Sequence, residues 1–110
     1  MSTLDVIREQ HDGQIYIRLA GELDIASAPT LETELRQVEN GAPATIVLDL
    51  RTLEFLDSTG LRIIIEADSR AREAGRRVVI VRGPAAVQRV LAVTRLDERL
   101  ELVDDPATVA

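Results

Sequence analysis

The sequence predicts a single α/β domain with the element order β-β-α-β-α-β-α-β and a mostly parallel, mixed sheet. Three observations support this fold class. A hairpin turn signal follows the first apolar segment, short apolar runs then alternate with segments of helical periodicity, and 110 residues, 45% of them apolar, suffice for one core. Because right-handed crossovers join the alternating strands and helices, these strands run parallel, while the hairpin adds an antiparallel pair at the N-terminus.

The N-terminal hairpin is predicted from its turn and from alternating side chains. Residues 4–7 form a modest strand among charged residues. Asp12-Gly13 suits a type I′ turn, whose two central residues both need a positive φ. Residues 15–19 then alternate apolar and polar side chains, as expected of a strand with one buried face. The alternation is interrupted at residues 21–24, where we expect the strand to give way to a helix.

The first helix is predicted to begin at Ser27 as its N-cap, with Pro29 in the first turn. Its apolar side chains recur at helical spacing, at Leu31, Leu35 and Val38. The helix closes at residues 40–41, Asn-Gly. The nearly continuous apolar run at residues 45–50 then predicts a central strand that is covered on both faces.

The second helix is predicted to follow residues 55–61 and to end at Gly75. We expect ion pairs four residues apart on its solvent-exposed side, between Glu66 and Arg70 and between Asp68 and Arg72. Its apolar stripe consists of Leu61, Ile64, Ile65 and Ala71, with Asp68 at the edge of the stripe.

The C-terminal part of the chain repeats the alternation of strand and helix. Residues 78–81 predict a buried strand, and residues 83–84, Gly-Pro, open a third helix. The inward side chains of that helix are Val87, Val90 and Leu91. Residues 100–103 predict a last short strand, and residues 104–106 could start a further helical turn.

Composition excludes several classes of partner and site. All 13 basic residues are arginine and cysteine is absent, which excludes lysine Schiff bases, P-loop lysines, disulfides and cysteine metal sites. A formal charge of −6 and only two aromatic residues, Tyr16 and Phe55, argue against a nucleic-acid partner. No apolar run approaches the ~20 residues of a membrane span, and no leader opens the sequence. We therefore expect a soluble, cytoplasmic protein that does not bind membranes.

The sequence offers little for catalysis. His11 is the only histidine and lies beside the hairpin turn, where we expect it to face solvent. Ser58 lacks the G-x-S-x-G setting of a hydrolase nucleophile, and no cluster of metal ligands or glycine-rich phosphate loop is present. A small enzyme using Ser58 or Asp57 is an alternative, but a second catalytic group is missing. We predict no enzyme activity, no cofactor and no bound metal.

The turn Asp57-Ser58-Thr59-Gly60 allows two interpretations. In the structural one, Ser58 caps the second helix and Asp57 adds a favourable charge near the positive end of the helix dipole. In the functional one, Gly60 matters because a first helical turn does not need glycine, which costs ~1 kcal/mol relative to alanine. The missing side chain would allow another protein to approach the neighbouring hydroxyl closely.

The sequence resembles the STAS family, and within it the small bacterial anti-sigma factor antagonists. The resemblance covers the whole chain, residues 1–110, as one STAS domain. The matching segments are Gly21-Glu22-Leu23-Asp24, the apolar run at residues 46–50, Phe55-Leu56-Asp57-Ser58-Thr59-Gly60-Leu61, Gly75, and Pro84-Ala85-Ala86-Val87. The combination of Gly-Glu-Leu-Asp with the later Asp-Ser-Thr-Gly-Leu is more specific than either segment alone.

The resemblance implies a switch that acts between proteins. Ser58 would be phosphorylated by an anti-sigma factor that is a serine kinase with a histidine-kinase-like ATPase fold. Unphosphorylated protein would bind the kinase and free the sigma factor, phosphorylated protein would let go, and a PP2C-type phosphatase would reset the switch. Thr59 is a second hydroxyl, but its position in the motif favours it less than Ser58.

The resemblance also implies a set of residues that bind the partner. These are Gly21, Glu22, Asp24, Asp57, Ser58, Thr59, Gly60 and Leu61. If Asp24 and Asp57 lie close together in the fold, they would make this corner negative and help to orient the kinase. The alternative is that Asp57 only supports the turn. A different function within the same family is a STAS interaction module of a stress-signalling scaffold or a transport complex, without an anti-sigma partner.

Overall fold

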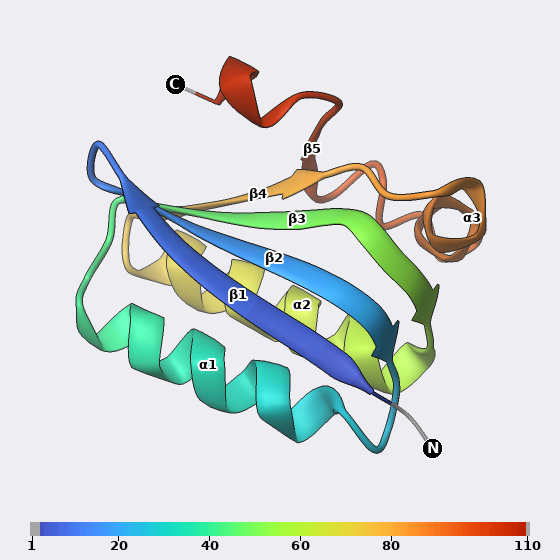
Figure 1. Cartoon of the computed structure of the whole chain (residues 1–110). Helices are drawn as coiled ribbons and strands as arrows, with labels where there is room; N and C mark the ends of the chain where they lie inside the picture. The colour runs from blue at the N-terminus through green and yellow to red at the C-terminus, as the bar shows by residue number, and fades with distance from the viewer. Residues whose placement is uncertain (1–2, 110) are drawn as a thin grey trace.

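Five strands form one mixed sheet in the order β1-β2-β3-β4-β5, in a computed structural model that describes residues 3–109 (Figure 1). β1 pairs antiparallel with β2, and the other neighbours pair parallel. The strands are β1 (Leu4–His11), β2 (Gln14–Leu23), β3 (Thr45–Leu56), β4 (Arg77–Val81) and β5 (Glu101–Val103). The predicted fold class is confirmed.

Three helices and a short 3₁₀ turn complete the fold. The helices are α1 (Ala28–Asn40), α2 (Ser58–Glu73) and α3 (Ala85–Val93), and the 3₁₀ turn is Pro106–Thr108. Figure 1 shows α1 and α2 along one face of the sheet, α3 beside the far end of β3, and the C-terminal turn on the opposite side of the sheet from α1 and α2. The predicted element order is therefore confirmed.

The core lies where α1 and α2 cover the sheet. Residues 45–50 of β3 are buried at every position, as the apolar run predicts for a central strand. The fully buried side chains of this layer include Ile17, Leu19, Leu31, Leu35, Leu48, Ile64 and Ile80. The hairpin turn is also confirmed, because Asp12 and Gly13 have φ values of 48° and 78°, as a type I′ turn requires.

The first three strands extend further than the sequence predicts, β1 to His11, β2 to Leu23 and β3 to Leu56. β2 does not end at residue 21 but continues to Leu23, where it pairs with Leu56 of β3. Register shifts in this pair, between Arg18 and Ala20 and after Gly21, break the alternation of side chains without ending the strand. Gly21 has a φ of 104°, and a Cβ there would lie 2.4 Å from the carbonyl oxygen of Thr3, so the irregularity requires glycine.

The polar side of α2 differs from the prediction. Asp68 is buried, and Arg70 bonds to Glu39 of α1 at 2.7 and 2.8 Å instead of pairing with Glu66. Glu66 pairs with Arg62, one turn earlier, at 2.7 Å. The predicted Glu66–Arg70 pair and the solvent-exposed position of Asp68 are therefore wrong. The reason is tertiary, because α2 is packed against both the sheet and α1, and α1 supplies a partner that the periodicity of α2 does not show.

Candidate functional site

Asp57 organises the start of α2. Its side chain accepts a hydrogen bond from the backbone N–H of Gly60 at 2.9 Å, and its carbonyl oxygen accepts one from Leu61 at 3.0 Å. Asp57 has extended backbone angles, φ −108° and ψ −179°, as an N-cap residue does. The prediction that Ser58 caps the helix is therefore wrong: Asp57 is the cap, and Ser58 is the first residue of α2.

The same aspartate joins the two motifs that lie more than thirty residues apart. Its second carboxylate oxygen accepts a hydrogen bond from the backbone N–H of Ile25 at 3.1 Å. Its own backbone N–H donates to the carbonyl oxygen of Leu23 at 3.2 Å. One side chain thus caps α2 and fixes the segment that follows Gly-Glu-Leu-Asp, so the sequence-predicted residues around Asp24 and Ser58 come together at one end of the sheet.

The loop after β2 is fixed by its own side chains. Asp24 accepts hydrogen bonds from the backbone N–H groups of Ala26 and Ser27 at 3.0 and 3.1 Å. The Ser27 hydroxyl donates to the carbonyl oxygen of Glu22 at 2.7 Å and accepts from the N–H of Asp24 at 3.0 Å. Ser27 is the N-cap of α1, as predicted, but its side chain bonds back to this loop and not into the helix. The carboxylates of Asp24 and Asp57 both hold backbone groups in place.

The predicted site residues differ in how accessible they are. Ser58 is exposed, and its hydroxyl forms no hydrogen bond to any residue within 3–109, while Thr59 is half-buried. Gly60 is buried, and a Cβ there would lie 2.5 Å from the Leu23 side chain, so packing inside the chain explains this glycine. Leu61 is 4% exposed and belongs to the core. Of the four residues 58–61, Ser58 therefore presents the most accessible side chain.

Two exposed apolar side chains lie in the same two segments as the predicted site residues, and neither of them is among those predicted residues. Ile25 is 74% exposed and Phe55 is 49% exposed. The backbone of Ile25 is held by its hydrogen bond to Asp57. Phe55 is the second-to-last residue of β3 and is paired in register with Glu22 of β2. The available signals were the position of Ile25 directly after the first motif and the scarcity of aromatic residues. We call Ile25, Phe55, Ser58 and Thr59 the switch surface.

Other chemistry is sparse in the part of the chain that the structure describes. The side chain of His11 is exposed, as predicted, and its Nε2 atom lies 3.1 Å from Oε2 of Glu9. Within residues 3–109, no group of three or more histidine or acidic side chains is arranged to hold a metal ion. Among the helices formed by these residues, none has the length and apolar character needed to cross a bilayer.

Comparison with known proteins identifies the fold family. Residues 7–104 match the family described as "Mlab, STAS domain". The chain belongs to the STAS domain family. The predicted resemblance is thereby confirmed.

The relatives of this STAS domain are named as regulators of sigma factors. The anti-sigma-F factor antagonist RsfB of Mycobacterium tuberculosis is 28% identical over 100 residues, which cover 91% of this chain and 81% of RsfB. The anti-sigma-B factor antagonist of Bacillus subtilis is 26% identical, with 90% of each chain covered. The crystal structure of an anti-sigma factor antagonist from Mycobacterium paratuberculosis has a TM-score of 0.84 and 31% identity, and covers 96% of this chain and 89% of that one. Each of these three relatives is named as an anti-sigma factor antagonist, and none of the three names describes an enzyme.

Proposed function

We propose that this STAS domain, residues 1–110, is an anti-sigma factor antagonist controlled by phosphorylation of Ser58. Unphosphorylated, it binds an anti-sigma factor that is a serine kinase with a histidine-kinase-like ATPase fold, and the sigma factor is freed. Phosphorylation of Ser58 by that kinase releases the antagonist from the kinase, and a PP2C-type phosphatase restores binding. The observation that carries this proposal is the position of Ser58. It is the first residue of α2, directly after the N-cap Asp57, and its hydroxyl is exposed and forms no hydrogen bond to the residues that the structure describes.

The position of Ser58 suits a modification that changes binding without changing the fold. A phosphate adds ~−1.5 to −2 charges at neutral pH. The N–H groups of Ser58 and Thr59 open the helix and have no intrahelical partners, so they can donate to phosphate oxygens. The added charge would lie next to Asp57, whose carboxylate holds the backbone of Ile25, and it would raise the cost of removing this end of the sheet from water. Phosphorylation is therefore expected to change the affinity for the partner more than the fold of this chain.

The roles proposed for the neighbouring residues follow from their contacts. Asp57 and Asp24 position the loops through backbone hydrogen bonds, and Gly21, Glu22 and Gly60 shape the backbone behind the switch surface. Ile25 and Phe55 supply the apolar contact area that a partner would bury. Leu61 contributes through the packing of α2 and not through its side chain.

The deciding experiment mixes the purified protein with a candidate anti-sigma kinase and ATP. We expect one phosphate, located on Ser58 by mass spectrometry, and we expect Ser58→Ala to stay unmodified yet bind the kinase. Thr59→Ala should still be phosphorylated, whereas Ser58→Asp should bind about tenfold more weakly. Phosphate on another residue, or full binding by Ser58→Asp, would contradict the mechanism. A STAS module of a scaffold or transport complex would show neither kinase binding nor phosphorylation.

The same assay tests the switch surface. Ile25→Ala and Phe55→Ala should each weaken kinase binding about tenfold, or 1.4 kcal/mol, because exposed apolar side chains at the centre of an interface contribute most of its free energy. Val93→Ala is the matched control, since Val93 is also an exposed apolar residue but lies at the end of α3. Equal effects of all three substitutions would show that the partner does not bind around Ser58.

A further inference from the structure

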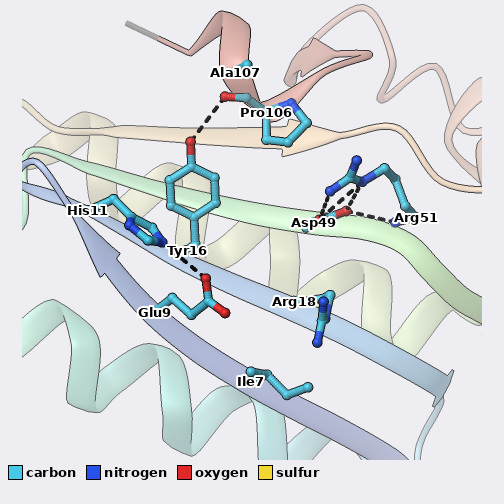
Figure 2. A pocket seen from close by; sticks show the side chains of 9 residues that line it. All are labelled: Ile7, Glu9, His11, Tyr16, Arg18, Asp49, Arg51, Pro106 and Ala107. Carbon is cyan, nitrogen blue, oxygen red and sulfur yellow. Dashed lines mark hydrogen bonds and ion pairs between the residues drawn. The ribbon is translucent and has the colours of Figure 1, made fainter.

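A second candidate site lies on the face of the sheet that α1 and α2 leave uncovered. β1, β2 and β3 form its floor, and the C-terminal 3₁₀ turn forms one wall (Figure 2). The cavity has a volume of about 330 Å³. Sites for small molecules span ~300–1,000 Å³, so this cavity lies at the lower end of that range. Its lining shares no residue with the switch surface.

The Tyr16 ring, in the apolar part of the cavity, is held by a hydrogen bond and a ring contact. The hydroxyl of Tyr16 donates a hydrogen bond to the carbonyl oxygen of Pro106 at 3.1 Å. The His11 ring meets the Tyr16 ring edge-on, with 5.5 Å between centroids and 80° between planes. Ile7 of β1 lines the cavity as well and is 39% exposed. A ring that is fixed in place before a ligand arrives loses little conformational freedom on binding, which favours affinity.

The acidic side chains of the cavity already have partners. Both oxygens of Asp49 accept hydrogen bonds from the Arg51 guanidinium, at 2.8 to 3.2 Å, and Glu9 pairs with His11. Burial would raise the pKa of Asp49, but the hydrogen bonds and charge of Arg51, with the charge of Arg18, outweigh it and hold that pKa below its usual value. Asp49 is therefore ionised and neutralised at neutral pH.

Arg18 is the cation of the cavity that makes no direct contact with an acidic side chain in the described part of the chain, although its charge acts on Asp49. Within residues 3–109 its guanidinium forms no hydrogen bond and no ion pair. Figure 2 shows it projecting from β2 between Ile7 and the Asp49–Arg51 pair, a position that follows from the register, since Arg18 pairs with Ile7 on one side and Asp49 on the other. An unoccupied guanidinium fork beside an apolar wall is complementary to a carboxylate that carries an apolar group.

We propose that this cavity binds a small organic carboxylate, with the anionic group on Arg18 and the apolar group against Ile7 and the Tyr16 ring. Arg51 offsets the charge of Asp49, and Glu9 is engaged by the hydrogen bond with His11, so Arg18 is the group that meets the anion directly. This binding is independent of the proposed phosphorylation of Ser58, because the two sites share no residue.

Benzoate and its neutral analogue benzamide are the probes that test this site. Titration of the ¹⁵N-labelled full chain with benzoate should give saturable shifts of the amide signals of Tyr16, Arg18 and Arg51, with benzamide binding about fivefold more weakly. Saturable shifts of equal strength with benzamide would contradict selection by charge. Absence of any saturable shift with benzoate, or shifts located elsewhere, would overturn the site itself.

Substitution of Arg18 separates the charge from the cavity. Arg18→Gln should weaken benzoate binding about fivefold and lower the melting temperature only slightly, because this exposed side chain loses no hydrogen bond or ion pair and only the longer-range attraction to Asp49. Arg36→Gln is the matched control, since Arg36 lies exposed on α1, outside the cavity, and the variant loses the same charge. Equal benzoate affinity of the two variants would overturn the role of Arg18.

Discussion

Two buried carboxylates, Asp49 on the outer face of the sheet and Asp68 on α2, have opposite environments. Asp49 is 5% exposed and Asp68 is 2% exposed, yet the pKa of Asp49 lies below its usual value and that of Asp68 lies above it. Burial raises the pKa of both. The two sites differ in how completely the neighbouring arginine compensates the cost of burying the charged carboxylate.

The geometry of the arginine explains the difference. Arg51 donates hydrogen bonds from its side chain to both oxygens of Asp49, and its backbone N–H adds a third donor at 3.0 Å. Arg72 lies 3.0 Å from Asp68 Oδ2, but without the angle of a hydrogen bond, and its guanidinium also donates to the carbonyl oxygen of Arg99. A nearby positive charge lowers the cost of burying a carboxylate, but hydrogen bonds to both oxygens remove most of it.

The largest loss of stability is expected when a substitution introduces a buried carboxylate that has no arginine beside it. Leu48 precedes Asp49 on β3, but its side chain enters the core between the sheet and the helices and is fully buried. Leu48→Asp should therefore lower the free energy of unfolding by about 4 kcal/mol or more, because the new carboxylate has no partner and the packing of leucine is lost. Urea denaturation measures this loss. A soluble variant with cooperative unfolding at the original midpoint would mean that β3 is wrongly placed.

The next effect comes from removing the arginine that compensates Asp49. Arg51→Gln leaves a buried carboxylate with fewer donors and should cost about 2 kcal/mol at neutral pH, a value reduced by the partial exposure of Arg51 itself. Chemical denaturation measures this cost. The control is Arg62→Gln, which breaks the exposed Arg62–Glu66 pair and should cost less than about 0.5 kcal/mol. Equal losses in the two variants would show that burial of Asp49 does not matter.

These residues also show how far the sequence predicts the structure. Periodicity and turn chemistry predicted the hairpin, the element order and the buried central strand. The pairing of Asp68 with Arg72 was predicted from their spacing, but the burial of Asp68 was not, because it depends on what packs against α2. Asp49 was visible only as a polar interruption of an apolar run.

The site was predicted at the level of segments more than of individual roles. The two motifs were expected to define one site, and hydrogen bonds from Asp57 do join them. The N-cap of α2 is Asp57 and not Ser58, because the carboxylate of Asp57 accepts a hydrogen bond from the N–H of Gly60 from the position before the helix. The exposure of Ile25 and Phe55 was not predicted, since exposure of an apolar side chain depends on the fold and cannot be read from its local sequence.

The smallest expected effect is in how stability changes with pH when each carboxylate is replaced by its neutral amide. The pKa of Asp49 is lowered in the folded state, so its ionised form stabilises the fold above about pH 3.8, and this contribution is lost as the pH falls through the lowered pKa. Asp49→Asn should therefore be less stable than the natural protein near neutral pH, and the difference should shrink in acid.

Asp68→Asn should show the opposite trend. The pKa of Asp68 is raised in the folded state, so the folded protein holds this proton more tightly than the unfolded chain and loses stability as the pH rises from about 3.8 through the raised pKa. An asparagine does not titrate, so the stability of the variant relative to the natural protein should increase with pH over this window. Urea midpoints measured for both variants from about pH 2 to about pH 7 cover both windows and test the pair. Parallel curves would show that burial, and not the donors that each arginine supplies, controls both carboxylates.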